Sequence, residues 1–167
     1  VEITTGLIFL LIINYQVSII NAVFLWYVAA SLIGIFVYDL RNYFIPDVVL
    51  FPAIVAVLLL RFIDNWKLII DNYGSAALLA SGFFLAIFLV SRGTWMGFGD
   101  VKLAILMGLL LGFPNILVAL LAAFWLGAMI GLALMIFKKK GLKSEMPFAP
   151  FLITGTFLAL FWGPQII

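Results

Sequence analysis

Residues 103–137 read LAILMGLLLGFPNILVALLAAFWLGAMIGLALMIF, a run of 35 positions without a charged side chain. At a rise of about 1.5 Å per residue, one helix of this length would be longer than the roughly 30 Å hydrocarbon core of a bilayer. Phe113-Pro114-Asn115 interrupts the run, because proline removes a backbone donor and asparagine favours turns. The stretch therefore predicts two membrane helices that are separated near Pro114.

The same apolar character extends through the chain of 167 residues, of which 67% are hydrophobic and 10% are charged. A soluble domain of this size could not bury so much apolar surface, so the sequence predicts an integral membrane protein. We expect one all-α domain, residues 1–167, that forms a polytopic bundle with about seven transmembrane or membrane-embedded helices. The expected helices are residues 3–15, 18–39, 47–62, 74–91, 99–112, 115–137 and 147–163.

Most of the basic residues are expected on one side of this bundle. The polar connectors are residues 40–46, 63–73, 92–98 and 138–146, and the alternation of helices places all but the second on the same side as the N-terminus. That side holds seven of the nine basic residues, namely Arg41, Arg92, Lys102, Lys138, Lys139, Lys140 and Lys143. Because an excess of Lys and Arg marks the cytoplasmic side, this side is predicted to be cytoplasmic.

The chain contains no cysteine and no histidine. This composition excludes disulfides, cysteine-ligated haem or iron–sulfur groups and the usual zinc sites, so we expect no metal and no cofactor. It also excludes Ser-His-Asp and Cys-His catalysis, which leaves carboxylates and lysines as the strong acid–base groups. The net charge of +2 is small and no basic aromatic surface is visible, so we expect no nucleic-acid partner.

Two aspartates interrupt the apolar pattern at helix ends, where a carboxylate is costly unless a function or a partner retains it. Asp39 ends the second expected helix and Asp100 begins the fifth, both on the cytoplasmic side. Each aspartate alone is consistent with a carboxylate that the headgroup layer hydrates. As a pair, they provide what a protein needs to activate water without a metal or a histidine, so we interpret Asp39 and Asp100 as catalytic.

The helix positions of the two aspartates predict different roles. An anion is stabilised at a helix N-terminus and opposed at a C-terminus, and two carboxylates that share a site do not both ionise easily. We therefore expect Asp100 to be the base that takes a proton from water, and Asp39 to be the acid that faces the scissile carbonyl. The pair titrates as a unit, so this assignment describes one microstate of the pair.

The neighbours of the aspartates predict a shaped site. Gly97 and Gly99 either form a flexible loop or let a substrate backbone approach the second aspartate closely. Pro46 and Asp47 are typical of a helix start, where we expect a structural or site-shaping role. Lys102 follows the second aspartate by two positions and so points in a different direction. It either extends to lipid phosphates or attracts an acidic residue of a substrate.

Three patches of the chain resemble the type IV prepilin peptidase family, the aspartic membrane peptidases that also include preflagellin peptidases. The patches are Asp39 followed by Ile45-Pro46-Asp47, then Gly97-Phe98-Gly99-Asp100-Val101-Lys102, then Met146-Pro147-Phe148-Ala149-Pro150-Phe151-Leu152. The resemblance runs through essentially the whole chain, and the combination is more specific than any one motif. It implies that Asp39 and Asp100 are the catalytic pair.

The resemblance also implies a substrate and a location. Members of this family remove the short basic leader of type IV prepilins and pseudopilins at the cytoplasmic face, just before an apolar helix. We therefore expect an aspartic endopeptidase of the cytoplasmic (inner) membrane whose partners are a prepilin or pseudopilin helix and the lipid bilayer. Many bacterial members also carry an N-terminal segment with paired Cys-x-x-Cys motifs and methylate the new N-terminus with S-adenosylmethionine. This chain begins at Val1 without those cysteines, so we expect a truncated chain or a minimal peptidase, and no methylation by it.

Three other interpretations fit parts of the pattern. Tyr38-Asp39 and Gly97–Asp100 also match the presenilin and signal-peptide-peptidase group, but the Pro-Ala-Leu element of that group does not occur here. A small transporter or channel would place carboxylates along a path through the membrane, and the central parts of the expected helices contain none. A non-catalytic scaffold that keeps the fold without the activity stays open.

Overall fold

The structure is a computed structural model that describes residues 5–6, 19–136 and 147–166, and its regular elements there are all helical. The expected helix 3–15, apart from residues 5–6, and the whole connector 138–146 with its lysines lie outside the described residues. Within them, the elements are α2 (Ile19–Asn42), α3 (Asp47–Leu68), the π-helical η1 (Ile69–Gly74), α4 (Ser75–Ser91), α5 (Phe98–Leu111), α6 (Asn115–Ile136) and α7 (Ala149–Ile166).

In the described part of the chain, three helical segments are long and apolar enough to cross a membrane. They are Asn21–Asn42, Ile69–Ser91 and Asn115–Leu134, and Ala149–Gly163 is a shorter apolar helix. Large apolar side chains such as Leu78 are exposed on these helices, as expected for surfaces that face lipid. The chain is therefore a polytopic helical membrane protein, which confirms the class that its composition predicts.

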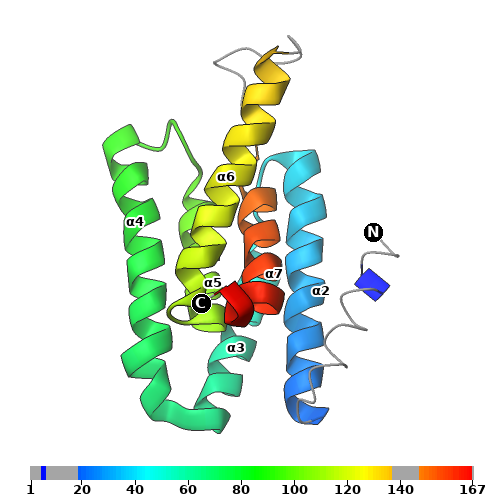
Figure 1. Ribbon diagram of the computed structural model, residues 1–167, viewed down its shortest axis with the longest axis vertical. Coiled ribbons are helices and arrows are strands. Elements are labelled where there is room, and N and C mark those ends of the chain that lie inside the picture. Colours follow the sequence, from blue (N-terminus) through cyan, green and yellow to red (C-terminus); the bar gives the residue numbers. More distant parts are fainter. Residues whose placement is uncertain (1–4, 7–18, 137–146, 167) are drawn as a thin grey trace.

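Consecutive helices run in alternating directions, so their ends gather at two ends of the bundle (Figure 1). The last residues of α2, α4 and α6 lie toward the upper end of Figure 1, and so do the first residues of α3, α5 and α7. Asp39 lies near the end of α2 and Asp100 near the start of α5. This alternation therefore places the two aspartates at the same end of the bundle.

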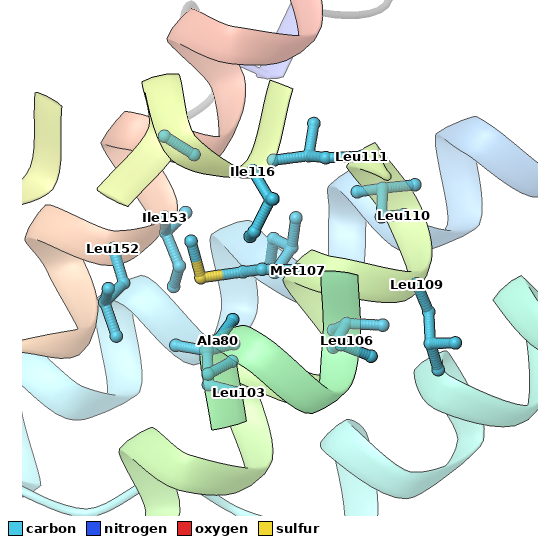
Figure 2. Packing of buried hydrophobic residues seen from close by; sticks show 14 of the residues in the cluster. Ala80, Leu103, Leu106, Met107, Leu109, Leu110, Leu111, Ile116, Leu152 and Ile153 are labelled. Atoms are coloured by element: carbon cyan, nitrogen blue, oxygen red, sulfur yellow. The ribbon is translucent and has the colours of Figure 1, made fainter. Parts of the chain in front are cut away.

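Helix α5 occupies the centre of the bundle, where it contacts α3, η1, α4, α6 and α7. Ten of its fourteen residues are buried, so it is surrounded by protein along most of its length. Leu103 and Met107 belong to the same buried cluster as Ile116 of α6 and Leu152 of α7 (Figure 2). A helix of this length measures only about 21 Å and is too short to span a bilayer, so neighbouring helices must enclose it.

The break near Pro114 is confirmed, since α5 ends at Leu111 and α6 begins at Asn115. Gly112 ends α5 with a φ of 66°, a left-handed conformation that favours glycine. A Cβ at this position would lie 2.8 Å from the ring of Tyr73 in η1, so the turn also needs a residue without a side chain. The end of α5 is thus fitted closely against η1.

The prediction of a non-helical polar connector at residues 63–73 is wrong. Helix α3 continues to Leu68 and η1 follows directly, so the chain stays helical from α3 into α4. Polar residues within and beside this segment have partners in the bundle. The Arg61 guanidinium donates to the carbonyls of Leu109 and Leu110, and the Asn72 side chain donates to the carbonyl of Phe113. The bonds from Arg61 satisfy free carbonyls in the last turn of α5, and the bond from Asn72 satisfies the carbonyl of Phe113 in the turn that follows. The polar residues of this segment therefore bind other parts of the bundle, and the chain there is helical.

Candidate active site

Asp39 lies in the last turn of α2 and only 4% of it is exposed. The backbone N–H of Ala149, at the start of α7, donates a hydrogen bond to its carboxylate. Its Oδ2 is buried and has no hydrogen-bond partner among the residues that the structure describes. Because buried polar atoms in proteins nearly always have a partner, this oxygen marks a place where a water molecule or a substrate group can bind.

Asp100 is the third residue of α5 and is 7% exposed. Gly97 precedes the helix in an extended conformation and its N–H donates a hydrogen bond to the Asp100 carboxylate. In return, the Asp100 N–H donates to the Gly97 carbonyl at 3.2 Å. The carboxylate therefore caps its own helix, which agrees with the expected position of an anion at a helix N-terminus.

Both aspartates line one open cleft of about 920 Å³, and they interact electrostatically. The cleft is bounded by the connection between α2 and α3, the loop between α4 and α5, the first turn of α5 and the segment before α7. It is lined by six of the predicted site residues: Asp39, Asp47, Gly97, Gly99, Asp100 and Lys102. The burial of both aspartates differs from the hydrated state expected of a carboxylate in the headgroup layer.

Pro46 is the predicted site residue that does not line the cleft. Its carbonyl accepts the N–H groups of Val49 and Leu50, each at 3.1 Å, so Pro46 precedes the first turn of α3. Asp47 is the first residue of that helix. The predicted helix start is therefore confirmed, and Pro46 fixes the direction in which α3 leaves the cleft.

The two glycines of the site have different surroundings. A Cβ at Gly99 would lie 3.1 Å from the Cβ of Ile45, a buried residue in the connection between α2 and α3. A Cβ at Gly97 would meet only the backbone N of Gly99, at 3.9 Å. Gly99 therefore permits close packing of α5 on that connection, which the sequence pattern did not indicate. Gly97 lines the cleft without such a close neighbour, and the approach of a substrate backbone to it stays a prediction.

Lys102 and Asp47 form an ion pair that sequence reasoning missed. The Lys102 Nζ donates to both carboxylate oxygens of Asp47 at 2.8 Å. It also lies 5.4 Å from the ring centroids of Phe51 and Phe98, within the range of a cation–π interaction. The two residues are 55 positions apart, so no local pattern could have indicated their contact.

Aromatic side chains form part of the cleft wall, which the sequence analysis did not indicate. Phe44, Trp95, Phe98 and Phe148 all line the cleft. Trp95 is 76% exposed, in the loop between α4 and α5. The signal that could have found them is their position in or next to the three patches of sequence quoted above. Together they give the polar cleft an apolar rim.

The arrangement has the groups needed for hydrolysis of an amide bond. Two buried carboxylates can divide the roles of acid and base toward a water molecule between them. Among the residues that the structure describes, no cluster of three or more His, Cys, Asp or Glu side chains could hold a metal ion. The carboxylates that line the cleft are Asp39, Asp47 and Asp100.

Comparison with known protein families matches residues 26–132 to the type IV leader peptidase family. Similar curated proteins are named prepilin leader peptidase/N-methyltransferase. The one from Legionella pneumophila is 28% identical over 92% of this chain and 54% of its own length. The one from Bacillus subtilis (strain 168) is 30% identical over 81% of this chain and 54% of its own length. The one from Pseudomonas putida is 27% identical over 81% of this chain and 48% of its own length.

The chain spans about half the length of the curated relatives it matches. No solved structure gives a significant match. The family match includes both Asp39 and Asp100, because its residues extend from α2 into α6.

Proposed function

Because this chain belongs to the type IV leader peptidase family, we propose that it is an aspartic endopeptidase that removes the leader of type IV prepilins or pseudopilins. The observation that carries the proposal is that Asp39 and Asp100 come from two different helices, are both buried and line the same cleft. Buried carboxylates are costly to retain in a membrane protein without a function or a partner.

Asp47 is the third carboxylate of the cleft, but it differs from the other two in its contacts. Both of its oxygens accept hydrogen bonds from Lys102. The Oδ2 of Asp39, in contrast, is buried and has no hydrogen-bond partner among the described residues. These contacts favour Asp39 and Asp100 as the reacting pair.

In the proposed reaction, a water oxygen attacks the scissile carbonyl carbon while Asp100 takes a proton from the water. Asp39 gives its proton to the carbonyl oxygen, which produces a tetrahedral diol. The C–N bond then breaks, Asp100 passes its proton to the leaving amine, and Asp39 recovers a proton from the diol. The hydrogen bond from Gly97 and the N-terminal end of α5 favour the ionised form of Asp100, whereas its burial and the nearby charge of Asp39 oppose that form. The two carboxylates therefore do not both ionise easily, and the division of roles describes one microstate of the pair.

The proposed topology has about seven membrane helices, with the cleft at the cytoplasmic face of the inner membrane. Arg41 at the end of α2, Arg92 at the end of α4 and Lys102 lie at the end of the bundle that carries the cleft. Arg61 and Lys67 belong to the second half of α3, which runs toward the opposite end. This distribution of positive charge supports a cytoplasmic cleft.

A cleft at the end of a membrane bundle suits a substrate that has a polar leader joined to an apolar helix. The apolar helix can stay in lipid while the junction with the leader enters the cleft. The alternative of a transporter finds no support, since the buried charged residues in the described segments are Asp39 and Asp100, both at one end of the bundle. A path across the membrane for ions would need ionisable groups at successive depths.

The experiment that tests this function is cleavage of a purified prepilin by the purified chain in liposomes, followed by intact-mass analysis. We expect one cut between the leader and the apolar helix, without any added metal or cofactor. A folded chain that leaves several prepilins and pseudopilins uncut would contradict the proposal. The proposal covers leader cleavage alone and does not include the N-methyltransferase activity in the relatives' name.

A further inference from the structure

The ion pair between Asp47 and Lys102 connects the two segments that carry the aspartates. Asp39 lies in the last turn of α2, and Asp47 begins α3 after the short connection 43–46. On the other side, Lys102 follows Asp100 by two positions in α5. The ion pair is therefore a direct link between the α2–α3 connection and the first turns of α5.

Lys102 acts on a different side of α5 from Asp100. Each helical residue turns the direction of the side chain by about 100°, so residues two positions apart point in nearly opposite directions. Asp100 is buried beside the charge of Asp39, while Lys102 reaches the start of α3. The lysine can thus hold the turn that carries the aspartate without contacting the reacting atoms.

The two hydrogen bonds of the ion pair fix the position of the Lys102 ammonium group relative to the Asp47 carboxylate. Both oxygens of Asp47 are bonded at the same 2.8 Å distance, which restricts the direction of the carboxylate. Phe51 of α3 and Phe98 of α5 both lie beside the Nζ, so the ammonium group is enclosed by one aromatic ring from each helix. The side chains remain 22% and 43% exposed, so the pair is expected to add little to global stability.

Three further contacts hold α5 in place, one at its first turn and two at its other end. Ile45 packs against Gly99 at the first turn. At the other end, Arg61 and Asn72 bind the last carbonyls of the helix and of the following turn. Loss of the ion pair would therefore leave α5 in the bundle, but its first turn would lose its polar contact with the start of α3 and could shift relative to α2.

We propose that Asp47 and Lys102 are positioning residues, which hold the first turn of α5 against the start of α3 so that Asp100 faces Asp39. This role rests on the proposed function, because it concerns the geometry of the same catalytic pair. Displacement of a catalytic group by about 1 Å can lower a rate about a hundredfold. The pair therefore acts on the chemical step, whereas a lysine that attracts an acidic substrate residue would act on substrate binding.

The test compares prepilin cleavage kinetics of the parent chain, Asp47→Asn, Lys102→Gln and the charge-reversed double variant Asp47→Lys with Lys102→Asp. We expect each single variant to lower kcat by roughly ten- to a hundredfold, with KM changed by less than about threefold. The double variant restores an ion pair of opposite direction, so it should regain at least about tenfold in kcat over either single variant. Lys102→Arg keeps the charge and should remain within about threefold of the parent.

Asp71→Asn and Lys67→Gln, at the other end of the bundle, are matched controls that should leave kcat unchanged. Thermal unfolding in detergent identifies any variant that does not fold. If a single variant does not fold, the kcat values of Lys102→Arg and of the double variant decide whether the ion pair has a positioning role. Single variants with the parental kcat would overturn the positioning role. So would a rise in KM at constant kcat, or a double variant no better than the singles. If the parent chain itself cuts no prepilin, the proposed function fails and the positioning role fails with it.

Discussion

The Lys102 Nζ donates to both carboxylate oxygens of Asp47, and so joins two helix starts that are 55 positions apart in the sequence. Asp47 begins α3, and Lys102 lies in the first turns of α5. Asp39 and Asp100 lie next to these two helix starts and line the same cleft. The end of the bundle that carries the cleft therefore contains a polar contact between distant segments, while apolar packing surrounds the middle of α5.

The glycines of the cleft provide one prediction. Gly99→Ala places a Cβ 3.1 Å from the Cβ of Ile45, so Ile45 and the first turn of α5 must move apart by a few tenths of an ångström. We expect leader cleavage by this variant to fall by about tenfold or more, because Asp100 moves with that turn. Gly82→Ala in α4 is the matched control, since nothing lies within 4 Å of the added Cβ and the residue does not line the cleft, and it should stay within about threefold of the parent. Equal activity of the two variants would contradict the packing role of Gly99.

The distal end of α5 provides a prediction on stability. Arg61→Gln removes the donors to the carbonyls of Leu109 and Leu110 and the contact of the guanidinium with the ring of Tyr73, 4.0 Å away. We expect the free energy of unfolding to fall by about 1–3 kcal/mol, because buried carbonyls lose their partners. Thermal or denaturant unfolding in detergent measures this change. Lys67→Gln in the same helix is the control, and a similar loss in both variants would show that the carbonyl bonds are unimportant.

The orientation of the bundle can be tested with single cysteines, because the chain has none of its own. Trp95→Cys places a thiol in the exposed loop beside the cleft, and Asp71→Cys places one in η1 at the opposite end. In intact spheroplasts, a membrane-impermeant maleimide is expected to label the cysteine at position 71 only. The cysteine at position 95 should react after permeabilisation. The reverse pattern would place the cleft on the periplasmic side.

The apolar runs predicted most of the fold because membrane helices need internal hydrogen bonding and a defined length. Pro114 marked the boundary between α5 and α6 correctly, since its effect on the backbone is local. The polar segment 63–73 misled the prediction, because Asn72 and the nearby Arg61 bind carbonyls about 40 to 50 positions away. Polar residues in a membrane protein indicate a partner, and the sequence does not say whether that partner is water or another helix.

The site was predictable in part for a similar reason. Asp39 and Asp100 stand out because a carboxylate beside an apolar segment is costly wherever it occurs. The partner of Lys102 and the contact of Gly99 with Ile45 depend on how α5 packs against the α2–α3 connection. No periodicity or spacing within either segment records that packing. The aromatic rim of the cleft was missed because Trp95 and Phe44 have the composition of a lipid-facing surface.

The central claim is that Asp39 and Asp100 together perform the hydrolysis. The most direct measurement is the rate of prepilin leader cleavage by the parent chain, Asp39→Asn, Asp100→Asn and the matched control Asp71→Asn, each shown to be folded. Asparagine keeps the size of aspartate but cannot exchange the proton, so we predict that both cleft variants lose about a thousandfold or more in rate. Asp71→Asn should cut at the parental rate. Cleavage near the parental rate by either folded cleft variant would contradict the account.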